Sequence, residues 1–261
     1  MLLELEADDI RVEVDPAAGG RIASLEVGGL QLLVPRRADP LGWGCYPMVP
    51  WAGRLRNGSF RFAGRLHRLP LSLAPHAIHG TTWGRAWRDE GGGRLAIDLG
   101  DGDGWPFRGR AVQDLALDPG GLRMRLELHA EDEPFPACIG WHPWFRRKLA
   151  RGGEASLALC ARWMYRRDAG GIATAERVPP GPGPWDDCFT GLEAPPRVSW
   201  TGALRVTLES SASHWVVYDE PADAFCVEPQ TGPPDALNIA PDVVHPGRPL
   251  VAEARLGWVR A

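Results

Sequence analysis

One histidine is set among aromatic rings and a proline in the segment from Phe135 to Phe145, which reads Phe-Pro-Ala-Cys-Ile-Gly-Trp-His-Pro-Trp-Phe. This residue, His142, precedes a proline, which restricts its backbone to extended conformations. An imidazole titrates near neutral pH, so it can act as a general acid or base. The same surroundings also suit a core histidine bonded to a backbone carbonyl. A catalytic role for His142 therefore requires a partner.

A candidate partner lies far along the chain at Glu228, in the segment Phe-Cys-Val-Glu-Pro-Gln-Thr-Gly. The carboxylate stands where an apolar, strand-like run meets a proline, and burying a charge there without a use is costly. A glutamate that is exposed at the strand end, or that caps the following loop, is the alternative. If His142 and Glu228 face each other, they form an acid and a base that can serve one substrate.

Two further candidates, Arg54 and His79, stand in loop-like segments rich in proline and glycine. The planar guanidinium of Arg54 suits a substrate hydroxyl or an anionic oxygen, although a surface ion pair is the ordinary role of such an arginine. His79 precedes Gly80, which permits close approach of the backbone, although histidines near turns are often only solvated. His76 and His79 have no helix to align them, and the other five of the seven histidines are scattered, so no metal site is predicted.

The elements that must position these residues have the pattern of strands. Apolar and polar residues alternate over 10–15, 122–129 and 204–209, as in strands with one buried face. The nearly continuous apolar run from Ala155 to Ala161 predicts a strand covered on both faces. Turn signals such as Val27-Gly-Gly-Leu30 lie between such runs, and the 32 glycines and 25 prolines disfavour long helices. We expect an all-β, mainly antiparallel sandwich in a single domain over residues 1–261, with 178–185 as a surface loop.

Composition excludes several classes of function. The net charge of -4 gives no basic surface for nucleic acid, and no stretch approaches the length of apolar sequence that crosses a membrane. The five cysteines are spread without CxxC spacing, which is typical of a protein of the reducing cytoplasm. The acidic start does not resemble a signal peptide. We expect a soluble cytoplasmic protein without nucleic-acid or membrane partners, while the oligomeric state stays open.

Taken together, these segments resemble the aldose 1-epimerase (galactose mutarotase) family. The agreement runs in order along the chain through Val14–Leu25, Arg54, His79-Gly80, His142–Phe145, Glu228-Pro229 and Pro246-Gly247. The resemblance implies an antiparallel β-supersandwich that interconverts the α and β anomers of an aldose without a metal or organic cofactor.

The resemblance also implies roles for single residues. His142 falls at the position of the general acid and Glu228 at that of the general base, with Arg54 and His79 at substrate-binding positions. Asp187 matches the sugar-binding aspartate, although the match can shift by one residue to Asp186.

This chain departs from the common family pattern at three positions, Gly53, Thr81 and Trp144. These departures concern the identity of the sugar more than the type of reaction. Two alternatives to a free aldose remain open. One is epimerisation of a hexose 6-phosphate, which requires two or more convergent cations. The other is a carbohydrate-binding module without turnover.

Overall fold

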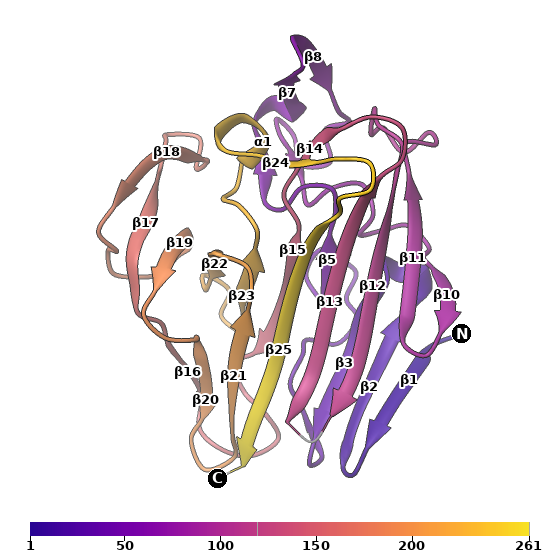
Figure 1. The fold of residues 1–261 in the computed structure, drawn as a ribbon. Helices are drawn as coiled ribbons and strands as arrows, with labels where there is room; N and C mark the ends of the chain where they lie inside the picture. The colour runs from indigo at the N-terminus through magenta and orange to yellow at the C-terminus, as the bar shows by residue number, and fades with distance from the viewer. Residues whose placement is uncertain (119, 261) are drawn as a thin grey trace.

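Two large antiparallel sheets, packed face to face, make up most of the computed structural model (Figure 1). The structure describes residues 1–118 and 120–260, and Pro119 and Ala261 lie outside it. The expected all-β antiparallel architecture is confirmed.

The larger sheet has eleven strands. In spatial order they are β1 (Leu3–Ala7), β2 (Ile10–Asp15), β3 (Arg21–Val27), β5 (Cys45–Met48), β15 (Gly140–Arg146), β23 (Ala224–Gln230), β22 (His214–Tyr218), β19 (Asp186–Leu192), β17 (Ala161–Arg167) and β18 (Ala173–Val178), with β4 (Leu30–Gln31) paired to β3.

The smaller sheet has eight strands. In spatial order they are β10 (Arg88–Gly91), β11 (Arg94–Leu99), β12 (Gly109–Asp118), β13 (Gly121–Ala130), β25 (Leu250–Arg260), β21 (Leu204–Ser210), β20 (Arg197–Trp200) and β16 (Ala155–Ala158). Strand β25 therefore lies between β13 and β21, although it comes last of these strands in the sequence.

Short elements complete the fold. Three two-stranded sheets are formed by β14 (Phe135–Ala137) with β24 (Asp242–Val244), β6 (Arg54–Leu55) with β9 (Ala77–Ile78), and β7 (Ser59–Phe62) with β8 (Arg65–Arg68). The helical elements are η1 (Pro16–Ala18), η2 (Arg56–Gly58) and α1 (Ala236–Ile239). No helix in the described residues is long and apolar enough to span a membrane.

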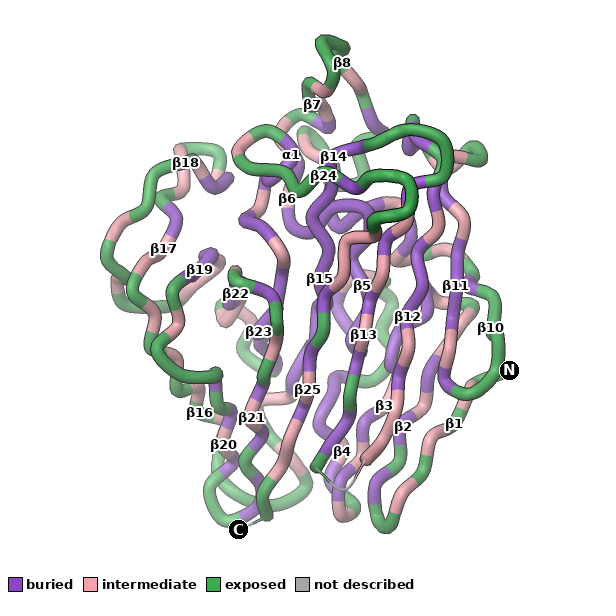
Figure 2. The backbone as a smooth tube through the Cα atoms, in the orientation of Figure 1, coloured by how far each residue is buried: buried purple, intermediate pink, exposed green. Residues whose placement is uncertain are grey.

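The core lies between the two large sheets and contains the apolar residues of the alternating segments. Val12 of β2 faces it from the larger sheet, and Leu126 of β13 and Val206 of β21 face it from the smaller one; all three are fully buried. Figure 2 shows buried residues throughout the central strands and exposed residues in the connecting loops. The alternation therefore predicted strands β2, β13 and β21 correctly, and residues 179–185 form the expected connection between β18 and β19.

One predicted strand was wrong. The run from Ala155 to Ala161 is not a strand covered on both faces, because β16 ends at Ala158 and β17 begins at Ala161 in the other large sheet. Strand β16 forms the edge of the smaller sheet, and its residues are intermediate or exposed. Leu157 is its one large apolar side chain and is only partly buried against the core, so hydrophobicity alone did not indicate the place of this strand in the fold.

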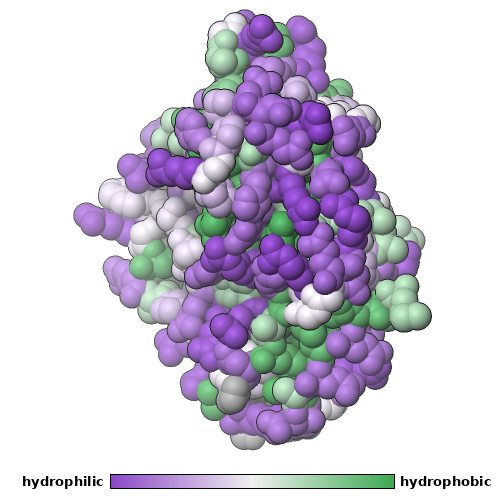
Figure 3. All heavy atoms as spheres, turned by 45° about the vertical axis from the view of Figure 1, so that its right-hand side comes forward, coloured by the Kyte–Doolittle hydropathy of each residue, from purple (hydrophilic) through white to green (hydrophobic). Residues whose placement is uncertain are grey.

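The outer face of the smaller sheet carries ion pairs between neighbouring strands, such as Arg94 with Asp114 at 2.9 Å. With the right-hand side of Figure 1 turned forward, the molecular surface is mainly hydrophilic, with small hydrophobic patches (Figure 3). An antiparallel sheet with one polar face is typical of contact with solvent. The larger sheet is different, because the residues of β5 and β23 are buried along their whole length.

Candidate active site

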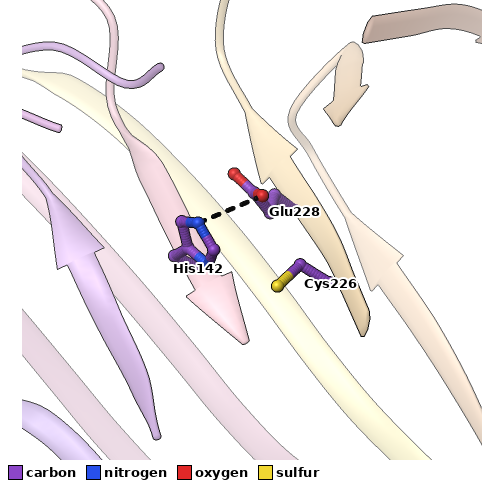
Figure 4. Close-up of side chains that lie close together, drawn as sticks. All are labelled: His142, Cys226 and Glu228. Carbon is purple, nitrogen blue, oxygen red and sulfur yellow. Dashed lines mark ion pairs between the residues drawn. The ribbon is translucent and has the colours of Figure 1, made fainter. Parts of the chain in front are cut away.

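His142 and Glu228 face each other from adjacent central strands of the larger sheet. Strands β15 and β23 pair Gly140 with Gln230 and Trp144 with Cys226, which sets His142 opposite Glu228. The His142 Nε2 and Glu228 Oε1 atoms are 3.3 Å apart, and their side chains are only 6% and 2% exposed (Figure 4). Residues eighty-six positions apart are thus brought together by the register of two strands.

Aromatic rings hold the imidazole of His142. Tyr46, its cross-strand neighbour on β5, stacks at 4.9 Å between ring centroids, and Trp144 stacks at 5.3 Å. The ring of His79 meets it edge-on at 4.8 Å. Since stacked and edge-on rings fix an aromatic plane, His142 is oriented before any substrate binds.

A buried arginine lies beside this aromatic group. The Arg21 guanidinium is 4.8 Å from the Tyr46 ring centroid and donates hydrogen bonds to the carbonyl oxygens of Ala18, Trp43 and Trp83. Burial lowers the pKa of His142 to about 3, and the positive charge of Arg21 adds to this shift. His142 is therefore a neutral imidazole at neutral pH.

The environment of Glu228 also favours a neutral side chain. Burial raises the pKa of its carboxyl well above the usual range, and the negative charge of Asp186 contributes. The Gln230 amide donates a hydrogen bond of 3.0 Å to Glu228 Oε2, which orients the carboxyl group and leaves Oε1 toward His142. Burial thus favours the uncharged form of both partners, an imidazole for His142 and a carboxylic acid for Glu228.

Arg54 and His79 are positioned together by the short β6–β9 sheet, where Arg54 pairs with Ile78. His79 is 6% exposed, and its Nδ1 accepts a hydrogen bond of 3.3 Å from the Gly53 backbone. That contact assigns the remaining ring proton to Nε2, so the imidazole can donate there. Burial lowers the pKa of His79 well below its usual value, and electrostatic repulsion from His142 and Arg54 lowers it further. His79 is thus a neutral hydrogen-bond donor.

Two aspartates at the start of β19 differ in their surroundings. Asp186 lines the cavity beside His142, and its Oδ2 pairs with Arg54 Nη1 at 2.9 Å. Asp187 is 8% exposed and is not among the cavity-lining residues; its Oδ1 pairs with Arg167 Nε at 2.9 Å. The structure therefore brings Arg54, His79, His142 and Glu228 to one cavity, together with Asp186 in place of Asp187.

The cavity has a volume of about 150 Å³. An engineered apolar cavity of about 150 Å³ admits one benzene molecule, so this space suits a single six-membered ring. Its lining combines these polar groups with the apolar side chains of Ile78, Ile172 and Val216. A ring with both hydroxyl groups and C–H faces matches such a lining.

The residues at this site fit a metal ion poorly. Within the described chain, one atom each from His142, Cys226 and Glu228 lies within 4.8 Å of the others (Figure 4). Burial raises the pKa of the Cys226 thiol well above its usual value. A metal binds the thiolate and the ionised carboxylate, whereas this environment favours the protonated form of both.

Arg167 is a cavity-lining residue that the sequence did not reveal. It stands next to Arg166 in an arginine-rich strand without a recognisable motif. Its ion pairs join β17 to β19, and this neighbourhood becomes visible only when the sheet is assembled. Tyr46 was missed for the same reason, since its contact with His142 depends on the pairing of β5 with β15.

Comparison with known proteins gives a family match over residues 1–161, described as aldose 1-epimerase. The matched segment contains Arg54, His79 and His142 and ends before Asp186 and Glu228. The chain is also 23% identical over 217 residues to the uncharacterized protein YphB of Escherichia coli (strain K12). The alignment covers 73% of this chain and 74% of YphB.

Solved structures share the fold over the whole chain. A galactose mutarotase-like protein of Clostridium acetobutylicum is 15% identical with a TM-score of 0.88, covering 100% of this chain and 95% of the other. A galactose 1-epimerase of Lactobacillus acidophilus is 16% identical with a TM-score of 0.81, covering 100% and 94%. These likenesses confirm the supersandwich fold.

Proposed function

Because this chain belongs to the aldose 1-epimerase family, we propose that it interconverts the α and β anomers of a free aldose. The observation that carries the proposal is the His142–Glu228 pair, whose Nε2 and Oε1 atoms are 3.3 Å apart beside a cavity of about 150 Å³. Opening a pyranose requires removal of a proton from the anomeric hydroxyl and delivery of a proton to the ring oxygen. A proton donor and a proton acceptor in one cavity supply both.

In the proposed reaction, Glu228 is the general base and His142 the general acid. Glu228 takes the proton from O1–H as the C1–O1 double bond forms and the C1–O5 bond breaks. His142 gives a proton to O5, which becomes a hydroxyl. Rotation about C1–C2 and reclosure with the two roles reversed yield the other anomer.

The number of protons that the His142–Glu228 pair holds is consistent with this scheme. In the free protein the single proton of the pair resides on Glu228, because burial favours both neutral side chains. A bound sugar places hydroxyl groups beside the pair and offsets the desolvation of the charged forms. The proton then passes to His142 across their contact, and no proton from solvent is required. After each turnover the pair again holds one proton.

Three side chains are proposed to bind the sugar. The Arg54 guanidinium and the Nε2–H of His79 are donors for sugar oxygens, while the carboxylate of Asp186 is an acceptor for sugar hydroxyls. Asp187, the residue first matched to the sugar-binding position, is paired with Arg167 outside the cavity lining, so Asp186 is the better candidate. Each of the three cavity-lining groups is held by a contact with another protein residue.

The five free cysteines support the proposal that the protein works in the cytoplasm. Four of them are buried, and burial raises the pKa values of their thiols. Reduced, protonated cysteines are the ordinary state in a reducing compartment.

Anomer exchange tests the function directly. NMR exchange spectroscopy or polarimetry of freshly dissolved α-galactose and α-glucose should show acceleration by the protein. His142→Gln and Glu228→Gln should each lower kcat by about 10²–10⁴, because each removes one proton-transfer group. The measurement should be made on variants whose circular dichroism matches that of the wild type.

His129→Gln is the matched control, since His129 is a partly exposed histidine of the smaller sheet that pairs with Glu127. It should retain wild-type kcat. If a broad panel of aldoses shows no acceleration, or if both cavity variants keep full activity, the proposed function is wrong. Tight sugar binding in calorimetry without anomer exchange would instead identify a carbohydrate-binding module.

A further inference from the structure

Two arginines on the cavity wall converge on one carboxylate oxygen. Arg54 Nη1 of β6 and Arg167 Nη1 of β17 lie 2.9 and 3.4 Å from Asp186 Oδ2 of β19. All three residues line the cavity that contains His142 and Glu228. The side chains of both arginines are 32% exposed, and that of Asp186 is 18% exposed. The convergence point is therefore at the cavity surface and accessible to a ligand.

Two convergent guanidinium groups are the usual arrangement for binding a phosphate or a carboxylate of a ligand. Here the position between them is taken by a carboxylate of the protein itself. The second aspartate, Asp187, pairs with Arg167 Nε at 2.9 Å, so two arginines face two aspartates. An incoming anion would have to compete with Asp186 for both arginines and approach its negative charge.

We propose that Asp186 is a specificity-determining residue, which admits neutral aldoses and excludes sugar phosphates by occupying the anion position between Arg54 and Arg167. This inference rests on the proposed interconversion of anomers for the identity of the substrate. What it predicts directly is whether an anion can bind between the two arginines. Asp186 keeps a second oxygen for sugar hydroxyls, so one side chain both neutralises the arginines and accepts hydrogen bonds from the substrate.

The test replaces Asp186 by its uncharged isostere. Asp186→Asn leaves two guanidinium groups directed at a position without a carboxylate, so inorganic phosphate should bind at least about tenfold more tightly than to the wild type. Titration calorimetry measures this binding without reference to turnover. Among sugars, the ratio of kcat/KM for glucose 6-phosphate to that for glucose should rise by about tenfold or more.

Asp187→Asn is the matched control, because it removes the neighbouring charge but leaves Asp186 between the arginines. It should not gain phosphate binding. Adding Arg167→Gln to Asp186→Asn should abolish the gain, since only one guanidinium then faces the position. The proposal is overturned if Asp186→Asn binds phosphate no better than the wild type, or if Asp187→Asn shows an equal gain.

The wild-type protein provides a test that does not depend on the folding of any variant. Glucose 6-phosphate should be converted at least about tenfold less efficiently than glucose, and inorganic phosphate should not compete with glucose. Equal conversion of both sugars would overturn the proposal. Absence of any anomer exchange would refute the proposed function, whereas the calorimetric comparison of Asp186→Asn with the wild type would still decide the anion site.

Discussion

At the scale of single residues, burial decides how His142 and Glu228 share their proton. Desolvation is the largest cause of both pKa shifts, and the positive charge of Arg21 further opposes protonation of His142. The structure therefore supports a pair that is neutral as a whole and holds one proton over a wide range of pH. Such a pair behaves as one titrating unit with two macroscopic pKa values.

This arrangement predicts the pH dependence of kcat/KM, which reports the free protein. Activity requires one proton on the pair, and the second proton binds only as the pH approaches the lowered pKa of His142, about 3. On the alkaline side, activity is lost as Glu228 ionises, at a pH above the usual carboxyl range. Anomer exchange measured by NMR should therefore show no acid limb near pH 6.5, where an ordinary histidine titrates.

Circular dichroism over the same pH range separates loss of fold from loss of activity. An acid limb at pH 6–7 in folded protein would contradict the neutral pair.

The sequence was sufficient to identify His142 and Glu228 as candidates but not to describe their state. Their local surroundings, a histidine before a proline and a glutamate after an apolar run, are visible in short segments. Their pKa shifts and the role of Arg167 depend on contacts between strands far apart in the chain. Charge balance in a cavity is a property of the assembled sheet.

At the scale of elements, the turn after β9 determines where His79 lies. His79 and Gly80 both have positive φ, at 57° and 81°, and Gly80 bridges to Val49. Positive φ is uncommon outside glycine, although histidine adopts it more often than most residues, and two His79–Gly53 hydrogen bonds hold this conformation in place. The strained turn directs the imidazole of His79 toward His142.

Replacing Gly80 by alanine should disrupt this turn. The added Cβ would lie 1.8 Å from the Val49 carbonyl oxygen, whereas at Gly64, with φ of +78°, it would meet no atom within 4 Å. Gly64→Ala should lower the free energy of unfolding by about 1–2 kcal/mol, because it adds only the strain of positive φ. Gly80→Ala should lower it by about 1–3 kcal/mol more, because it adds the clash with Val49. Urea denaturation measures both free energies of unfolding. Equal destabilisation by the two substitutions would show that backbone contact at Gly80 is unimportant.

Strand prediction succeeded where alternation was strict and side chains were large. In β13, Leu122, Leu126 and Leu128 are buried, while Arg123 is exposed, as the pattern required. It failed for Ala155–Ala161, where a nearly continuous apolar run contains an edge strand and not a covered one. Which sheet receives such a segment depends on its neighbours, and that information is not local.

At the scale of the whole molecule, one apolar core joins the two large sheets. It extends from Ile10 in β2 to Leu256 in β25 and includes residues from both sheets. Neither sheet can keep its buried face covered without the other. The single domain expected from the sequence remains a prediction, and it has a measurable consequence.

Thermal or urea unfolding should proceed in one cooperative transition. Far-UV circular dichroism follows the strands, and fluorescence follows the 12 tryptophans, several of which are in the core. The two signals should change at the same denaturant concentration, because loss of either sheet exposes the shared core. Separate midpoints would indicate two independently folding units.

The central place of β25 has a consequence for protein synthesis. This strand pairs with β13 on one side and β21 on the other, and the ribosome makes it after both. Until β25 emerges, the nascent chain can build the smaller sheet only as two separate pieces, each with an unpaired edge. An unpaired strand edge can form hydrogen bonds with a strand of another chain, which leads to aggregation. The protein should thus depend most on chaperones in the period before β25 emerges, when the two pieces of the smaller sheet cannot yet be joined.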